Sequence, residues 1–260
     1  MNKLSFEKIL ENVPKNRVNI DIFEKIDSTN DEAKRITNSN EFNIIIAEEQ
    51  SKGRGRKGNK WFSPNSGNIY MTLFTENQLS EDPASLITGV VCRNSIRNID
   101  ERINISLKWP NDILYKNKKV GGILVEKEHY EKKIKTIIGI GINLNLKNKE
   151  SSWGDLSEFN LQEQRNELVA EIINNLVRAF DKKNNNWKEE WLNGCMHINR
   201  EIQIYDNKNI KKDAIFRDID DLGNAIIETD NGLEVFRSGH IKIKGTVSYT
   251  HLTLPTIYSV

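Results

Sequence analysis

One stretch of the chain guides the interpretation of all the others: Gly53-Arg54-Gly55-Arg56-Lys57-Gly58-Asn59-Lys60-Trp61-Phe62-Ser63-Pro64. Three glycines and four cations occupy its first eight positions. Glycine lets a backbone pass close to a ligand, and arginine and lysine offer charge and hydrogen-bond donors to an anion. The flanking segments 43–47 and 68–74 are short apolar runs typical of strands. The stretch therefore predicts a cationic loop between two strands that can hold a small anionic metabolite.

The same loop has the spacing Gly53-x-Gly55-x-x-Gly58, which literally matches a dinucleotide-binding pattern. That pattern needs a helix directly after it, because the pyrophosphate must meet a helix N-terminus. Here the next predicted element is the strand 68–74, and cations fill variable positions of the pattern. We therefore reject a dinucleotide site.

Length and charge restrict the class of protein. A chain of 260 residues suits one or two domains with a sizeable core. With 38 basic and 37 acidic residues, the formal net charge is +1, so no global field attracts nucleic acid or a membrane, and any anion site is local. No signal peptide or membrane-spanning run is present in the sequence. The two cysteines, Cys92 and Cys195, match no metal or redox spacing, and a cytoplasmic enzyme is the simplest class.

Hydrophobic periodicity predicts strands interspersed with helices. Residues Thr29 to Glu32 have the form of a capping box that opens a short helix after a strand-like segment, 20–26. Further helices are predicted over 83–99, 166–180 and 187–192, and further strands over 103–109, 122–126 and 135–145. From Ile198 onward, short alternating strands with Asp-Asn, Leu-Gly and Asn-Gly turns are typical of a small barrel. Without a regular βαβα alternation, the pattern predicts an α+β fold with a mixed sheet flanked by helices.

These elements divide the chain into a large domain, residues 1–195, and a small β domain, residues 196–245. Residues 246–260 do not continue the pattern and resemble one reading frame of a transposon-end adapter used in sequencing libraries. We expect a non-native tail there, with the true C-terminus lost just beyond Lys244; a genuine extension is the alternative. His251, which lies in this tail, enters no functional argument.

Five motifs occur in one order along the chain: Ser28-Thr29-Asn30, then Gln50 with the loop 53–64, Lys108-Trp109-Pro110-Asn111-Asp112, Lys119-Val120-Gly121-Gly122-Ile123-Leu124-Val125-Glu126, and Gly139-Ile140-Gly141-Ile142-Asn143. Together they resemble the biotin protein ligases, the biotin–[acetyl-CoA-carboxylase] ligases, from about residue 22 to residue 245. The resemblance implies a mixed-sheet catalytic domain followed by a small SH3-like β-barrel. Because Ser28 lies near the start, it also implies the short monofunctional form, without an N-terminal winged helix-turn-helix domain.

The resemblance implies a reaction in two steps. Biotin carboxylate attacks the α-phosphate of ATP, with Mg²⁺ present, and gives biotinyl-5′-AMP and pyrophosphate. A lysine of a biotin carboxyl carrier protein or domain of a biotin-dependent carboxylase then attacks this mixed anhydride and releases AMP. No DNA and no membrane are expected as partners, a homodimer stays open, and the sequence does not locate magnesium ligands.

The resemblance also assigns the reacting end of the site. Arg54 and Arg56, with Gly53 and Gly55, are implied to hold the biotin carboxylate and then the adenylate phosphate. Lys108 is implied to face the reacting oxygens and Asp112 to orient the carrier lysine. From composition alone, the alternatives are a solvated basic loop, a surface lysine at a strand end and a turn-forming aspartate. The implied catalytic residues are thus Arg54, Arg56, Lys108 and Asp112.

The remaining implied residues bind biotin and adenine. A ureido group presents two N–H donors and one carbonyl, which short hydroxyl and amide side chains satisfy. The resemblance gives this task to Ser28, Thr29, Asn30 and Gln50, and the rest of the pocket to Lys119, Gly122, Ile123, Gly139, Gly141 and Asn143, with Trp153 for stacking on adenine. A helix cap, strand bulges and an ordinary core tryptophan are the alternatives. Trp61 is expected to pack at the base of the loop, and no histidine receives a catalytic role.

Two rival functions stay open. The first is lipoate ligase or lipoyl transferase chemistry, another acyl transfer to a carrier lysine, whose enzymes lack this loop pattern. The second is a nucleic-acid-binding module that uses residues 53–60 as a basic patch with Trp61 for stacking. A net charge near zero and a single basic cluster oppose the second.

Overall fold

The computed structural model describes residues 3–37, 39–76, 83–130, 133–146, 153–181, 186–205 and 211–244. A large sheet is built from β1 (Val18–Ile26), β2 (Phe42–Gln50), β3 (Ile69–Thr75), β4 (Ser106–Lys108), β5 (Asp112–Tyr115), β6 (Lys118–Tyr130) and β7 (Lys133–Ile142). The helices are α1 (Phe6–Glu11), α2 (Thr29–Arg35), α3 (Ala84–Ile99), α4 (Arg165–Asp181) and α5 (Trp187–Gly194). A small sheet follows, with β8 (Glu201–Tyr205), β9 (Lys211–Ile219), β10 (Ala225–Thr229), β11 (Gly232–Phe236) and β12 (His240–Ile243).

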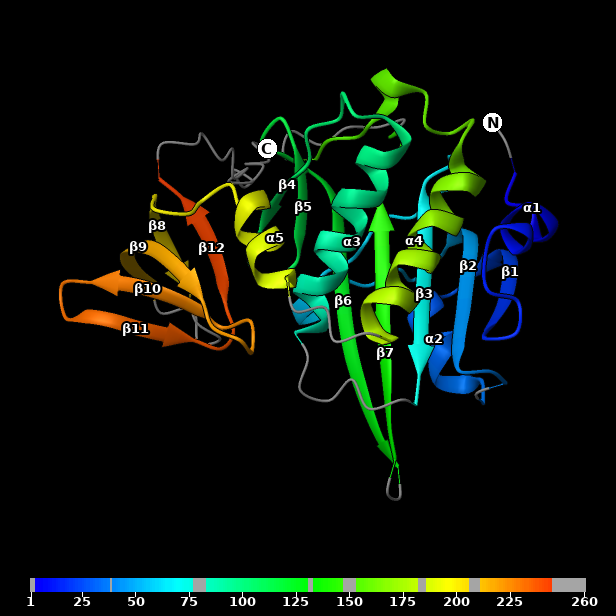
Figure 1. The fold of residues 1–260 in the computed structure, drawn as a ribbon, viewed down its shortest axis with the longest axis horizontal. Helices are drawn as coiled ribbons and strands as arrows, with labels where there is room; N and C mark the ends of the chain where they lie inside the picture. The colour runs from blue at the N-terminus through cyan, green and yellow to red at the C-terminus, as the bar shows by residue number, and fades with distance from the viewer. Residues whose placement is uncertain are drawn as a thin grey trace, which may run out of the picture.

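The strand pairing confirms the predicted α+β class with a mixed sheet. The large sheet has the order β1-β2-β3-β7-β6-β5-β4, in which β1 and β2 are parallel and the other neighbours antiparallel. The small sheet is antiparallel throughout, in the order β11-β10-β9-β8-β12, and lies beside the β4 side of the large sheet (Figure 1). The predicted boundary between residues 195 and 196 stays a prediction, and residues 246–260 lie outside the described chain.

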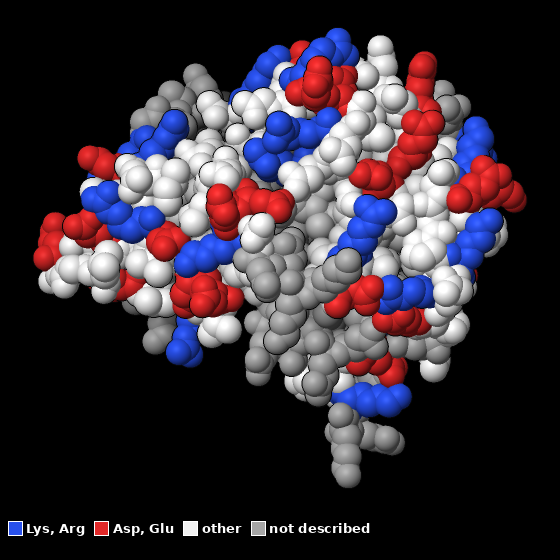
Figure 2. All heavy atoms as spheres, in the orientation of Figure 1, with Lys and Arg blue, Asp and Glu red and all other residues white. Residues whose placement is uncertain are grey.

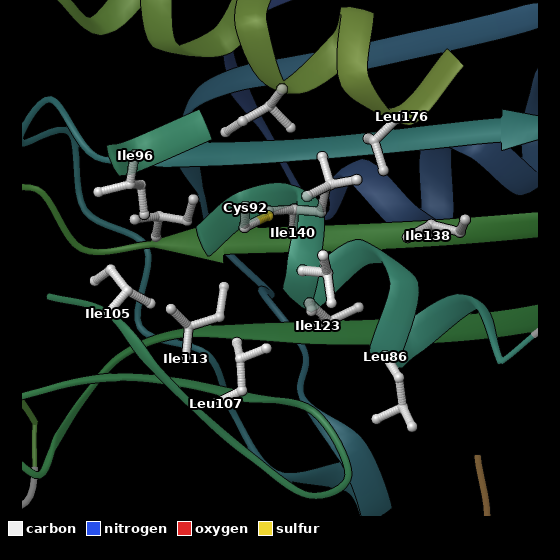
Figure 3. Packing of buried hydrophobic residues seen from close by; sticks show 14 of the residues in the cluster. Leu86, Cys92, Ile96, Ile105, Leu107, Ile113, Ile123, Ile138, Ile140 and Leu176 are labelled. Atoms are coloured by element: carbon white, nitrogen blue, oxygen red, sulfur yellow. The ribbon is translucent and has the colours of Figure 1, made fainter. Parts of the chain in front are cut away.

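Helices α3 and α4 cover one face of the large sheet (Figure 1). Successive side chains of a strand point to opposite faces, and in β7 the alternate residues Ile138, Ile140 and Ile142 join the core under these helices. Figure 3 shows Ile138 and Ile140 packed beneath Cys92 of α3 and Leu176 of α4. The intervening Gly139 and Gly141 consequently face the opposite side of the sheet, where the side chains of Asn30 and Trp61 approach them closely.

The short helix α2 crosses that opposite face. Its N-cap is Ser28, whose Oγ accepts a hydrogen bond from the Asp31 N–H at 3.4 Å, so the cap lies one residue before the predicted Thr29. At the other end, the buried Lys135 donates to the carbonyl oxygens of Ala33 at 3.0 Å and Ile36 at 2.8 Å. Both ends of the helix are therefore satisfied by fixed partners, and Thr29 and Asn30 are held buried against the sheet.

The segment after α3 forms a hairpin that the sequence pattern only partly predicts. The expected strand 103–109 is reduced to the three residues of β4, and β5 is an additional strand. Between β5 and β6, Lys116 and Asn117 both have positive φ, 47° and 63°, as a tight two-residue turn requires. This turn brings β6 back alongside β5.

The two sheets are joined by direct contacts near β4. The Trp109 indole N–H donates to the Gly223 carbonyl at 2.9 Å, and the Met196 N–H donates to the Leu107 carbonyl at 3.1 Å. On the face shown in Figure 2, acidic and basic side chains are interspersed, in agreement with the balanced composition. Among the described residues, no helix is both long and apolar enough to span a bilayer.

Candidate active site

A cavity of about 740 Å³ lies over the glycines of β6 and β7, on the face of the large sheet opposite α3 and α4. The loop after β2, helix α2, strands β4 to β7 and strand β12 of the small sheet contribute to its wall. Most of the residues predicted for the site line this one cavity: Ser28, Thr29, Asn30, Gln50, Arg54, Gly55, Arg56, Lys108, Asp112, Lys119, Gly122, Ile123, Gly139, Gly141 and Trp153.

Strand register explains why residues distant in sequence meet here. Residues directly opposite each other on antiparallel strands present their side chains to the same face. Lys108 pairs with Asp112, Asp112 with Gly122, and Gly122 with Gly141. One row across β4, β5, β6 and β7 therefore carries a cation, a carboxylate and two bare glycines on the cavity face.

The glycines form a floor that no larger residue can replace without displacing a neighbour. A Cβ atom on Gly141 would lie 2.5 Å from the Trp61 indole ring, and one on Gly139 would overlap the side-chain amide of Asn30. A Cβ on Gly122 would lie 3.2 Å from both Trp61 and Lys119. The absence of side chains at these positions is thus what lets Asn30 and Trp61 lie directly against the sheet beside the cavity.

One end of the cavity is polar and uncharged. Thr29 donates to Gln50 Oε1 from its backbone N–H at 2.8 Å and from its hydroxyl at 3.0 Å. The Thr72 hydroxyl lies 2.7 Å from Asn30 Oδ1 and 2.8 Å from Thr29 Oγ1. Ser28, Thr29 and Asn30 are all buried. Their fixed amide and hydroxyl groups offer both donors and acceptors to a small polar ligand group.

The other end is strongly cationic. Seven lysines and arginines line the cavity, against one acidic residue, Asp112. Burial lowers the pKa of Lys108, and Lys119 and Lys242 lower it further, while Asp112 opposes them. Burial likewise lowers the pKa of Arg56. These lowered pKa values mean that several positive charges lie close together and partly out of water. An anion bound in the cavity would therefore be stabilised.

The two loop arginines have different surroundings. Arg54 hydrogen-bonds with its three guanidinium nitrogens to Asp31 and Glu126, at 2.5 to 3.2 Å. Burial alone would lower its pKa, but these carboxylates outweigh burial and raise it. Arg56 donates only to the oxygens of Asn111 and Gly239, both at 3.2 Å, and forms no ion pair within the described chain. Arg56 therefore has charge available for a ligand, whereas Arg54 is already neutralised.

Lys119 lies in the middle of the cavity wall. Its Nζ is 2.5 Å from Asp112 Oδ1 and 5.4 Å from the centre of a Trp61 ring. The Trp61 ring is in turn 5.0 Å from that of Trp153, at an interplanar angle of 39°. Two tryptophans and a lysine thus form one contiguous surface beside the glycine floor.

Gly53 and Asn143 lie outside the cavity lining. Gly53 is at the base of the loop, where its carbonyl accepts from the Trp61 N–H at 2.9 Å. The buried Asn143 donates its N–H to the Val120 carbonyl at 2.7 Å and its side-chain amide to the Gly154 carbonyl at 3.2 Å. It therefore joins β7 to β6 and to the segment that carries Trp153.

Sequence reasoning missed part of the wall. Trp61, expected only to pack, lines the cavity, as do Lys60, Asn111, His240 and Lys242. The last two come from β12 of the small sheet. Alternation of basic and apolar residues from His240 to Lys244 was a usable signal, because it places the basic side chains on one face of a strand. Burial lowers the pKa of His240, and nearby lysines lower it further.

A metal site is not evident from the donor set. Among the described residues, no group of three or more histidine, cysteine, aspartate or glutamate side chains could hold a metal ion. The one cavity carboxylate, Asp112, is paired with Lys119. The described residues therefore do not by themselves form a magnesium site.

Comparison with known protein families identifies both parts of the chain. Residues 22–143 match the biotin/lipoate A/B protein ligase family, and residues 197–243 match the biotin protein ligase C terminal domain. The second match covers the small sheet. The description of this second family names biotin and not lipoate.

Individual proteins give the same result. The bifunctional ligase/repressor BirA of Escherichia coli K12 is 32% identical over 236 residues, which are 84% of this chain and 72% of that protein. A biotin–[acetyl-CoA-carboxylase] ligase of Paracoccus denitrificans is 32% identical over 126 residues, 46% of this chain and 52% of that one. The biotin protein ligase of Aquifex aeolicus, solved with biotin and ATP, superposes with a TM-score of 0.73 at 27% identity and covers 87% of this chain and 98% of its own.

Proposed function

The chain belongs to the biotin protein ligase family, and from this membership and its cavity we propose that it activates biotin with ATP and transfers it to a carrier protein. In the first step, a biotin carboxylate oxygen bonds to the α-phosphorus of ATP, and pyrophosphate leaves. In the second step, a lysine amine of a biotin carboxyl carrier protein bonds to the acyl carbon, loses a proton, and AMP leaves. The products are an amide-linked biotin, AMP and pyrophosphate.

One observation carries the proposal: a single cavity is lined by buried neutral polar side chains, by glycines of β6 and β7 with Trp61 against them, and by lysines and arginines. Biotin carries three groups that match these three kinds of lining: a polar ureido group, an apolar bicycle and a carboxylate. We assign the ureido group to Ser28, Thr29, Asn30 and Gln50, and the bicycle to the floor around Gly139 and Gly141. Backbone that lacks side chains allows such close approach.

The cationic end suits the first step. The carboxylate and the triphosphate repel each other, so fixed positive charge is needed where they meet. We assign this task to Arg56 and Lys108, which have no ion-pair partner in the described part of the chain. A partly buried cation acts more strongly than an exposed one, because little water screens it. The loop also covers the site, and a water-poor site protects a mixed anhydride from hydrolysis.

The remaining roles concern the second step and the nucleotide. Asp112 would accept a hydrogen bond from the carrier lysine and orient its amine toward the acyl carbon. Trp153 would stack on adenine, together with the neighbouring Trp61 ring; aromatic stacking on a base is worth roughly 1–3 kcal/mol. Mg²⁺ belongs to the proposal as a companion of the triphosphate, since it usually binds substrate phosphates and keeps several waters.

The partner proposed is a biotin carboxyl carrier protein or domain of a biotin-dependent carboxylase. A role without DNA binding stays a prediction. A homodimer stays open.

Exchange of labelled pyrophosphate into ATP tests the proposed first step. We expect exchange that requires biotin and is not supported by lipoate. Exchange that is supported by lipoate but not by biotin would show that the chain is a lipoate ligase and not a biotin ligase. Absence of exchange, together with salt-dependent binding of polynucleotide, would favour a nucleic-acid-binding module instead.

A further inference from the structure

The carboxylate of Glu126 accepts hydrogen bonds from two separate parts of the chain, the loop after β2 and helix α2. It accepts from Arg54 of the loop at 3.1 and 3.0 Å, from Lys34 of α2 at 2.9 Å, and from the side-chain amide of Asn30 at 2.8 Å. Glu126 lies on β6 two positions beyond Leu124, so its side chain points to the cavity face of the sheet. A carboxylate offers about four acceptor positions, and four donor contacts use them all.

A chain of hydrogen bonds continues from Asn30 through the polar end of the cavity. The Asn30 side-chain oxygen is 2.7 Å from the Thr72 hydroxyl, which is also 2.8 Å from the Thr29 hydroxyl. Thr29 donates to Gln50 Oε1, and Gln50 Nε2 donates to Ser63 Oγ at 2.9 Å. The chain thus begins at Arg54, near the start of the loop, and ends at Ser63, near its end.

Glu126 fixes the orientation of the Asn30 side-chain amide. Because a carboxylate only accepts, it holds the Asn30 amide with its NH₂ toward Glu126 and its oxygen toward Thr72. An asparagine without such a partner can present either end to a ligand. The orientation that a ureido group would meet is therefore set by a residue that does not line the cavity.

We propose that Glu126 is a positioning residue that fixes Asn30 for ligand recognition and, through Arg54, anchors the start of the loop. Arg54 then contributes to biotin binding through Glu126 and not by direct contact with the biotin carboxylate. This inference rests on the proposed function, because it assumes that the polar end receives the ureido group. It separates the two loop arginines: Arg54 is an anchor, and Arg56 is the anion ligand.

Ligand pairs that differ only in the carboxylate distinguish these roles. Biotinol, in which a primary alcohol replaces the carboxylate, keeps the ureido group and loses the charge. Calorimetric titration without ATP would compare biotin and biotinol for the wild-type chain and for Arg54→Ala, Glu126→Gln and the double variant. We expect each single variant to weaken both ligands by the same factor, on the order of tenfold, because hydrogen bonds between two half-buried charged groups are lost. We expect the double variant to be no weaker than the worse single variant.

Two further variants serve as controls. Lys25→Met removes an exposed cation that pairs with Glu49 at 2.6 Å, outside the Glu126 cluster and the cavity lining, so binding should change less than twofold, because a surface ion pair is worth little. Arg56→Ala should weaken biotin and spare biotinol. Denaturant unfolding of each variant separates loss of fold from loss of binding.

Three results would overturn the inference. They are a loss confined to biotin in Arg54→Ala, an unchanged affinity in Glu126→Gln, and fully additive losses in the double variant. Each of these three results can be interpreted only if the wild-type chain binds biotin. Failure of the wild-type chain to bind biotin would contradict the proposed function itself.

Discussion

Lys119 and Asp112 form an ion pair across the β5–β6 hairpin, with the ammonium nitrogen 2.5 Å from a carboxylate oxygen. The pair lies in the cavity wall, next to the glycine floor. The Asp112 carboxylate therefore already binds one amine, that of Lys119, at the place where an incoming carrier lysine would need an acceptor. This geometry makes Asp112 a specific candidate for the transfer step, beyond the turn-forming role that its neighbours Pro110 and Asn111 indicate.

Asp112→Asn should slow transfer more than activation. The amide keeps the shape of the side chain but loses the charge that orients an amine and accepts its proton, an effect of roughly 100-fold. Single-turnover transfer from preformed biotinyl-AMP to a carrier domain, compared with pyrophosphate exchange, measures the two steps separately. Equal slowing of both would contradict this role. Lys118→Ala, at an exposed neighbour in the same hairpin, is the matched control and should behave as wild type.

Lys108→Ala should cut activation while the fold persists. Lys108 is half-buried in a row with Asp112 and Gly122, and no ion pair within the described residues holds it. Removal of one fixed donor from developing charge typically costs 100-fold or more, so we expect biotin-dependent exchange to fall by roughly that factor. Lys52→Ala, at an exposed position before the loop, is the control. Wild-type exchange in Lys108→Ala would exclude the proposed role.

Arg56→Ala should let the intermediate form slowly and escape. Among the described residues, its guanidinium is bound only by two neutral oxygens, those of Asn111 and Gly239, and the second lies in the turn before β12. Loss of this cation removes both the charge facing the anhydride and a tie between the loop and the small sheet. Retention of labelled biotinyl-AMP on a filter measures escape. Retention equal to that of the wild-type chain would contradict the prediction.

The glycines that line the cavity and the loop 53–64 show which features the sequence predicts and which depend on the folded structure. Glycines at alternate positions of a predicted strand indicated close approach of a ligand, and Gly139 and Gly141 do line the cavity. The row from Lys108 to Gly141 could not be predicted, because it depends on the register of β5, a strand too short to recognise from four residues. Long-range pairing was equally hidden: Arg54 and Glu126 are 72 residues apart, and only the folded sheet brings them together.

Gly139→Ala should weaken biotin binding by at least about tenfold. The added methyl group would overlap the Asn30 side-chain amide, and strain of 1–3 kcal/mol is typical where a packed site receives an extra carbon. Gly89→Ala is the control, because it packs on the other face of the sheet and its Cβ would lie at an ordinary 3.5 Å from Leu107. Calorimetric titration with biotin measures both. Equal affinities for the two variants would contradict the proposed floor.

Acid should destabilise the protein through His197. This residue is fully buried among Cys195, Trp191 and Phe216, and burial lowers its pKa from 6.5 to about 3. Between pH 6.5 and pH 3 the unfolded chain binds this proton and the folded chain does not. The free energy of unfolding therefore falls as the pH falls through this window, by about 1.4 kcal/mol per pH unit from this group.

Urea unfolding at several pH values checks this contribution. In His197→Gln the slope of stability against pH should be smaller by that amount between pH 6 and pH 4, whatever the variant loses at neutral pH. An unchanged slope in the variant would show that His197 is protonated in the folded protein or does not contribute.

Mass spectrometry of a biotin carboxyl carrier domain, incubated with this chain, ATP, Mg²⁺ and biotin, tests the central claim most directly. We predict a mass gain of one biotinyl group, confined to a single lysine, appearing roughly 100-fold more slowly in Lys108→Ala and absent when lipoate replaces biotin. An unmodified carrier domain, or modification by lipoate in place of biotin, would contradict the assignment of the cavity to biotin and its adenylate.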